Sequence, residues 1–234
     1  LSDADDDVIL RYFLKAKLPD RLVEDFFTFF DVVKSPIAIR SSSLLEDSHY
    51  QPFAGIYNTY MIPYLDDKYE MLRMLSDAIK GVYASVYFRD FKGLYDKPQA
   101  MSIDQEKMAV ILQEVVGNQY GDRYYPSMSG VARSLNYYPI GDEKAEEGIV
   151  NLALGLGKYI VDGGMTLRFS PHSPNQVLQT SEMEIALKET QTRFYALDLR
   201  NAGHDFSIDD GFNLLKHARQ RRRKGRALNI HSLT

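Results

Sequence analysis

A change in hydrophobic periodicity along the chain is the feature that most restricts its fold. Between residues 68 and 91 the apolar residues recur with a period near 3.6, which predicts an amphipathic helix that Asp66 and Asp67 can cap. The segment 107–116, "KMAVILQEVV", is instead a continuous apolar run rich in branched residues, which predicts a strand buried on both faces. A chain that carries both patterns is expected to combine helices with a sheet.

The distribution of these patterns predicts an α+β fold with two lobes, its helices mainly early and its sheet mainly late. Residues 8–33 have a helical pattern that Pro19 interrupts, and Pro36 precedes a short buried strand that ends at Arg40. Further strands are expected over 131–139, 148–157, 166–169 and 192–199, and further helices over 181–189 and 209–220.

Composition excludes several classes of function. The chain has 234 residues, no cysteine and a net charge of −4, so disulfides and thiolate metal sites are absent and the whole chain has no electrostatic bias toward nucleic acid. No apolar run approaches the roughly 20 residues that a membrane helix needs. We therefore expect a cytoplasmic protein that does not bind membranes.

The stretch that follows the first strand carries the clearest chemistry. Arg40 is followed directly by Ser41, Ser42 and Ser43, and a guanidinium beside hydroxyls and loop amides can bind an anion. The alternative is a serine-rich turn in which Arg40 pairs with an acidic residue of the pair at 46 and 47. Chemistry alone leaves both interpretations open, because no short glycine–lysine phosphate motif is present.

Residues 37–62, "IAIRSSSLLEDSHYQPFAGIYNTYMI", closely resemble the signature of the ATP-binding domain of phosphoenolpyruvate synthase and pyruvate phosphate dikinase. The likeness continues in the same order with "VYASVYFRDF", "MAVILQEVV", "SGVARS" and "NLALGLGKYIVDGG", and it spans about residues 36 to 170. Several blocks in order are far more specific than any one block alone.

The resemblance implies an ATP-grasp-like fold, in which two α+β lobes hold the nucleotide between them. Arg40 would contact the ATP phosphates as the catalytic clamp, and the loop with Gly55 would lay backbone amides over them. The segment from Gln113 to Val116 would be the hinge that receives adenine. The positions implied to bind ATP are Arg40, Ser41, Ser42, Phe53, Ala54, Gly55, Thr59, Gln113, Glu114, Val116 and Lys158.

Three departures from the family pattern matter. No glycine-glycine-lysine segment precedes residue 36, so we expect the amino-terminal part of the domain to be missing. Lys158 stands where the family has a glutamate that would hold Mg²⁺, and Leu167 and Arg168 stand where it has proline and aspartate. ATP and Mg²⁺ are the implied cofactors, with a weakened metal site. That site is either a rearranged cationic phosphate site or a decayed one.

The resemblance also implies how the chain is organised and used. We expect a helical lead-in over 1–35, the nucleotide-binding domain over 36–200 and a helical, basic linker over 201–234. ATP would phosphorylate a histidine on a separate domain and then pyruvate, bound on another domain of the same full-length protein. The fragment alone would be inactive, since none of its five histidines lies in the family's phosphohistidine context.

Two other hypotheses come from different classes of function. A degenerate, non-catalytic ATP-grasp module could sense nucleotide or scaffold a partner, and Lys158 motivates this alternative. Residues 219–226 contain six basic residues, which could bind nucleic acid, although no aromatic residues for base stacking lie among them. A solvated helix end is the expected role of this basic run.

Overall fold

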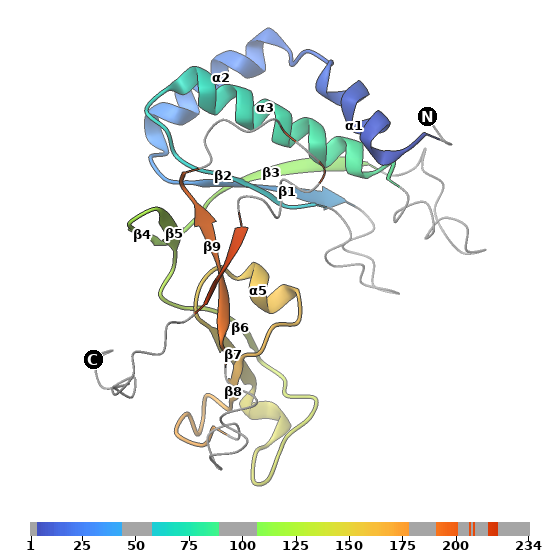
Figure 1. Ribbon diagram of the computed structural model, residues 1–234. Helices are drawn as coiled ribbons and strands as arrows, with labels where there is room; N and C mark the ends of the chain where they lie inside the picture. The colour runs from blue at the N-terminus through green and yellow to red at the C-terminus, as the bar shows by residue number, and fades with distance from the viewer. Residues whose placement is uncertain are drawn as a thin grey trace, which may run out of the picture. The chain divides into compact units, whose positions relative to one another are not determined.

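The computed structural model describes residues 4–43, 58–88, 107–177, 191–200, 206 and 208, together with the backbone of 215–219 (Figure 1). Both helices and strands occur within these residues, in agreement with the predicted combination of α and β structure. The chain divides into two compact units, one of Leu1–Ser127 with Ala196–Lys216 and the other of Met128–Tyr195 with His217–Thr234. The helix predicted over 181–189 lies outside the described residues.

The first unit contains an antiparallel sheet whose strand order is β2-β1-β3. In Figure 1 its helices lie on one side of this sheet. The elements are helices α1 (Asp6–Leu14), α2 (Asp20–Val32) and α3 (Lys68–Ser85) and strands β1 (Ile37–Ser43), β2 (Tyr60–Ile62) and β3 (Met108–Glu114). Among the described residues, helices cover one face of the sheet and leave the other without them.

The predicted helix boundaries follow local chemistry. Pro19, which has no backbone N–H to donate, separates α1 from α2 and stands at the start of α2. The Asp67 side chain accepts hydrogen bonds from the backbone N–H groups of Tyr69 and Glu70, at 2.9 and 3.3 Å, which confirms the predicted cap of α3. The helix ends at Ser85, earlier than predicted.

The main core of this unit fills the space between the sheet and helices α2 and α3. Its buried members are Phe26, Phe30, Ile37, Ile39, Tyr60, Ile62, Met71, Leu75, Ala78, Ile79 and Val82. The prediction that the segment 107–116 is buried on both faces is wrong, because β3 alternates between partly buried and exposed residues. Helices cover only one face of its sheet, and only Met108, Val110 and Leu112 pack against the core.

The carboxyl group of Asp77 on α3 is held at the margin of this core by two long ion pairs. Arg73 Nη1 lies 3.6 Å from one of its oxygens and Lys80 Nζ lies 3.8 Å from the other. Burial nevertheless raises the pKa of Asp77, because it outweighs the attraction of both cations. Each cation also has a second partner, Glu70 for Arg73 at 2.7 Å and the carbonyl of Leu14 for Lys80 at 3.1 Å.

We expect the substitution Asp77→Asn to raise the free energy of unfolding at pH 7 by up to about 1 kcal/mol, because it removes a poorly solvated charge. A raised folded-state pKa means that the wild type gains stability as the pH falls through that pKa toward the ordinary value of 3.8. The advantage of the variant should therefore shrink as the solution is acidified. Urea denaturation at pH 7, 5 and 4 measures it, and an advantage that grows toward pH 4 would contradict the burial argument.

A second sheet has the strand order β10-β9-β5-β4. Its strands are β4 (Asn118–Tyr120), β5 (Arg123–Tyr125), β9 (Arg193–Asp198) and β10 (Leu215–Arg219). The helix predicted over 209–220 is wrong over Leu215–Arg219, where the backbone pairs with β9 instead. Hydrogen bonding to the edge of β9, the preceding strand in the sequence, outweighs the local helical pattern there.

The second unit is built on an antiparallel sheet with the strand order β6-β7-β8. Its elements are β6 (Ser129–Arg133), the 3-10 helix η2 (Ala145–Glu147), β7 (Ile149–Ala153), helix α5 (Lys158–Val161) and β8 (Leu167–Phe169). The strands predicted over 148–157, 166–169 and 192–199 are confirmed with shorter bounds. The strand predicted over 131–139 ends at Arg133, where the chain turns into a loop.

Candidate functional site

Strand β1 places Arg40 on the face of its sheet that the helices do not cover. Along β1 the side chains of Ile37 and Ile39 are fully buried in the core, whereas Arg40 is exposed. Successive side chains of a strand point to opposite faces, so Arg40 points away from the helices. Ala38 and its partner Met61 on the same face are buried, so an exposed cation is presented beside a covered part of this face, on a strand that the core holds in place.

Arg40 and Gln113, which come from two separate sequence motifs, contact each other on this face. Arg40 Nη1 donates a hydrogen bond to Gln113 Oε1 at 3.2 Å. The register of β1 with β3 explains the contact. Ala38, two residues before Arg40 on the same face, is paired with Gln113, so Arg40 and Gln113 are diagonal neighbours across the two strands. Gln113 is neutral, so it orients the guanidinium without cancelling its charge. No carboxylate within the described part of the chain pairs with Arg40, and the acidic residues 46 and 47 lie outside it.

The serines after Arg40 are part of the strand, not of a loop. β1 continues through Ser43 and pairs with β3 along its whole length, so the expectation that the strand ends at Arg40 is wrong. Ser41 and Ser43 are buried on the helix-covered face, and Ser42 is half-buried on the face of Arg40. The strand thus brings Ser42, but not Ser41, to the same side as the arginine.

The positions expected to contact phosphate on the next strand are described only in part. Thr59 is half-buried and directly precedes β2, whose first residue Tyr60 is paired with Ile39. This register brings Thr59 to the Arg40 end of the sheet. Phe53, Ala54 and Gly55 lie outside the described residues, so the predicted phosphate loop stays a prediction.

The end of β3, predicted as an adenine hinge, exposes backbone at the edge of its sheet. The N–H of Val115 donates to the carbonyl of Pro36 at 2.8 Å, and the hydroxyl of Tyr124 donates to the carbonyl of Val115 at 3.0 Å. Val115 is thus a hydrogen-bonded position of the β1–β3 pair. Because such positions alternate along an antiparallel pair, the N–H and C=O groups of the preceding residue, Glu114, point away from β1. Val116, which follows, is 82% exposed.

Side chains around this edge fix its shape. The Glu114 carboxylate accepts a hydrogen bond from Ser35 Oγ at 2.7 Å, which ties the end of β3 to the segment before β1. Burial, with a smaller contribution from the Glu114 charge, raises the pKa of Tyr124. Tyr124 therefore stays protonated at neutral pH and keeps donating to Val115. What the edge offers to a ligand is the backbone of Glu114 and Val116.

Lys158, predicted to contact phosphate, lies in the second unit and has a partner of its own. It is the first residue of the short helix α5, and its Nζ forms an ion pair with Asp162 Oδ1 at 3.0 Å. A ligand phosphate would have to compete with this carboxylate. Within residues 4–43, 58–88, 107–177 and 191–200, no three His, Asp or Glu side chains come together as a metal site would require. Mg²⁺ at a nucleotide site is usually held by one or two carboxylates together with the phosphates, so the ion stays a prediction.

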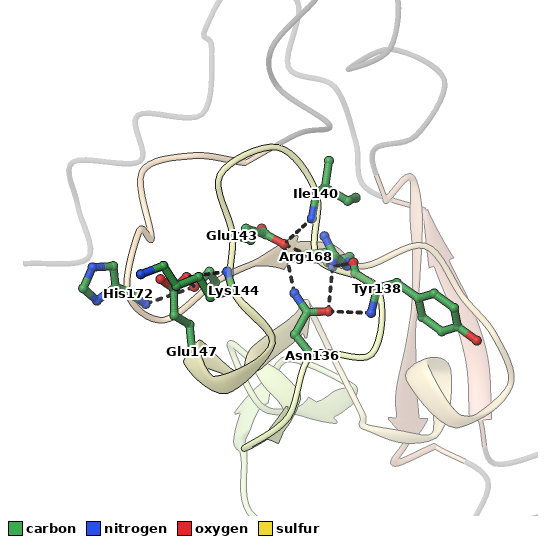
Figure 2. A network of polar contacts seen from close by, with 9 residues as sticks. Asn136, Tyr138, Ile140, Glu143, Lys144, Glu147, Arg168 and His172 are labelled. Atoms are coloured by element: carbon green, nitrogen blue, oxygen red, sulfur yellow. Dashed lines mark hydrogen bonds and ion pairs between the residues drawn. The ribbon is translucent and has the colours of Figure 1, made fainter.

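A polar network in the second unit was only partly visible in the sequence (Figure 2). Arg168 on β8 donates through Nη2 to Asn136 Oδ1 at 3.1 Å and to the carbonyl of Tyr138 at 2.7 Å, and it lies 3.4 Å from a Glu143 oxygen. Asn136 is 2% exposed and donates to the same Glu143 oxygen at 2.9 Å, which also accepts from the N–H of Ile140 at 3.1 Å. Arg168 therefore fixes the loop that follows β6.

Comparison with known proteins identifies the kind of protein to which these features belong. Over 150 residues, 64% of its length, the chain is 27% identical to a Bacillus subtilis (strain 168) protein named uncharacterized phosphotransferase YvkC. The chain spans only 16% of the length of that relative. The class indicated is a domain related to phosphotransferases.

A family model gives the family itself. Residues 3–203 match the model described as pyruvate phosphate dikinase, AMP/ATP-binding domain, and the chain belongs to this family. The family that the ordered motifs predicted is thereby confirmed. None of the helices described is long and apolar enough to cross a membrane. The expected cytoplasmic setting stays a prediction, and the basic run at 219–226 lies, except for the backbone of Arg219, outside the described residues.

Proposed function

We propose that this chain is the ATP-binding portion of a phosphoenolpyruvate synthase-like phosphotransferase. The observation that carries the proposal is the contact between Arg40 and Gln113 on the open face of β1 and β3. The motif of Arg40 was expected to bind phosphate and that of Gln113 to lie in the adenine hinge. Their contact places the two motifs side by side on one face of the sheet, where one nucleotide can reach both.

In this site Arg40 binds the ATP phosphates, with Ser42 and Thr59 as additional polar contacts. The exposed backbone of Glu114 and Val116 receives the edge of the adenine ring, as backbone N–H and C=O groups do in many cofactor sites. A cationic clamp of this kind suits phosphoryl transfer, where catalysis consists mainly of positioning and charge stabilisation. The phosphate loop with Gly55, a phosphate contact by Lys158 and the ATP-grasp-like fold remain parts of the proposal.

For the whole protein we propose the reaction that the resemblance to phosphoenolpyruvate synthase implies. ATP would phosphorylate a histidine on a separate domain, and a pyruvate-binding domain of the same protein would receive the phosphoryl group. The part played by this chain is to hold ATP by its phosphates and its base, and the chain alone would not complete the reaction.

One observation favours the alternative, a degenerate module that senses nucleotide or scaffolds a partner. Lys158, where the family has a metal-binding acid, is neutralised by Asp162 within its own helix turn. A module of this kind would retain nucleotide binding without Mg²⁺-dependent turnover. ATP hydrolysis or histidine phosphorylation by the full-length protein would exclude it.

Calorimetric titration of ATP into this chain, with and without Mg²⁺, tests the proposal. We expect saturable binding with a low-millimolar or smaller Kd, and weaker binding of GTP, because the edge of β3 is proposed to receive adenine. Stronger binding with Mg²⁺ would show that a metal contributes despite Lys158. Failure of ATP to bind both this chain and the full-length protein would overturn the proposal and leave the scaffold alternative.

A further inference from the structure

A pocket of about 180 Å³ opens on the β6-β7-β8 sheet of the second unit. The strand register brings three polar residues to the same face, because Asn151 on β7 is paired with Val131 and with Arg168, and Arg133 lies two residues after Val131 on β6. All three polar residues line the pocket. The remaining walls come from Leu135, Asn136, Tyr137, Tyr138 and Ile149.

The polar residues of the pocket are not equivalent. Arg168 is held by Asn136 and by the carbonyl of Tyr138, and Glu143 balances its charge. Arg133, in contrast, is exposed and makes no side-chain hydrogen bond or ion pair with any residue that the structure describes. The pocket therefore carries one positive charge that no described carboxylate neutralises.

Asn151 supplies a second donor beside this charge. Its Oδ1 accepts a hydrogen bond from Thr166 Oγ1 at 3.2 Å, which identifies Nδ2 as the group directed elsewhere. No acceptor for Nδ2 lies among the residues described. A guanidinium and an amide N–H₂ on one face of a sheet form a donor set that matches a carboxylate or another oxyanion.

The size and walls of the pocket restrict the rest of the ligand. An apolar cavity of about 150 Å³ can hold benzene, whereas sites for drug-sized ligands start near about 300 Å³. The volume of about 180 Å³ therefore suits a single six-membered ring and is too small for a nucleotide. Leu135 and Ile149 offer apolar contact, and the rings of Tyr137 and Tyr138, 69% and 82% exposed, lie at the rim.

We propose that this pocket is a second ligand site, which binds a small anion built on one ring, such as an aromatic carboxylate. The anionic group lies against Arg133 and Asn151, and the ring contacts the walls formed by Leu135 and Ile149. The residues of this pocket all belong to the second unit, whereas the ATP site proposed around Arg40 is built on the first unit, and neither proposal is argued from the other.

The test titrates benzoate into the complete 234-residue chain and follows amide chemical shifts. We expect saturable shifts at β6 and β7 and weaker binding of acetate, which lacks the ring, and of benzyl alcohol, which lacks the charge. Arg133→Gln should weaken benzoate about tenfold or more, because it removes a charge-assisted hydrogen bond. Arg193→Gln, a change at an exposed arginine of the same unit outside the pocket, should leave the affinity unchanged.

A second variant keeps the test decisive. Asn151→Asp preserves the acceptor for Thr166 but places a carboxylate in the pocket, so it should abolish benzoate binding while the chain stays folded. The proposal is wrong if benzoate causes no saturable shift, if acetate binds as tightly, or if Arg193→Gln weakens binding as much as Arg133→Gln. Competitive displacement of benzoate by ATP would also overturn it, since the pocket would then belong to the nucleotide site.

Discussion

Replacing Arg40 by alanine is expected to weaken ATP binding about 30-fold, because a hydrogen bond to a charged group contributes about 2 kcal/mol and each 1.4 kcal/mol changes an affinity about tenfold. The melting temperature should hardly change. Arg40 is exposed on the face without helices, and Gln113 is its hydrogen-bond partner there, so the core does not depend on it. Calorimetric titration gives the affinity, and thermal unfolding followed by circular dichroism gives the stability.

Two matched variants separate a specific clamp from a general effect of charge. Arg21→Ala removes another exposed cation, from α2, which packs on the opposite face of the sheet, and should leave ATP affinity unchanged. Arg40→Lys retains the charge but loses the planar fork of donors, so its affinity should lie between those of the wild type and Arg40→Ala. ATP binding by Arg40→Ala as tight as that of the wild type would refute the assignment of Arg40 to the phosphates.

The parts of the fold that could be predicted depend on neighbours in the sequence. Helix α3 and its cap at Asp67 follow from periodicity and from one carboxylate within hydrogen-bond reach of two backbone N–H groups. The break at Pro19 follows from the chemistry of proline. The burial of β3 could not be predicted in this way, because an apolar strand is buried on two faces only when a second layer of structure covers it.

The candidate site shows the same limit more clearly. Arg40 and Gln113 are 73 residues apart, and their contact depends on the register between β1 and β3. The motifs identified both residues but could not bring them together. Ser41 illustrates the converse, since its place in the motif predicted a ligand contact and the alternation of the strand turns it toward the core. The Arg168 network brings together residues about 30 apart along the chain, and no periodicity indicates such a contact.

The glycines of the segment "GLGK" provide the second large expected effect. Gly155 has φ of +87°, a conformation that disfavours other residues, and a Cβ added there would lie 2.7 Å from the carbonyl oxygen of Tyr195 and 2.8 Å from the Phe194 ring. The adjacent N–H of Leu156 donates to the same Tyr195 oxygen at 3.0 Å, so the backbone cannot easily move away. We expect Gly155→Ala to destabilise the second unit by about 2–4 kcal/mol. Hydrogen exchange of the β7 amides measures this local stability directly.

Gly157→Ala is the matched control, two residues further along the same segment. Gly157 has φ of −58°, and the nearest atom to an added Cβ would be Ser129 Cβ at 3.8 Å, an ordinary contact. The alanine should fit and stabilise the unit by about 0.4–1 kcal/mol, because it restricts the unfolded chain. If both variants keep the stability of the wild type, the close approach of Gly155 to β9 is wrong. If Gly157→Ala stays folded but no longer binds ATP, Gly157 contributes to ligand binding, whereas Gly155 contributes to stability.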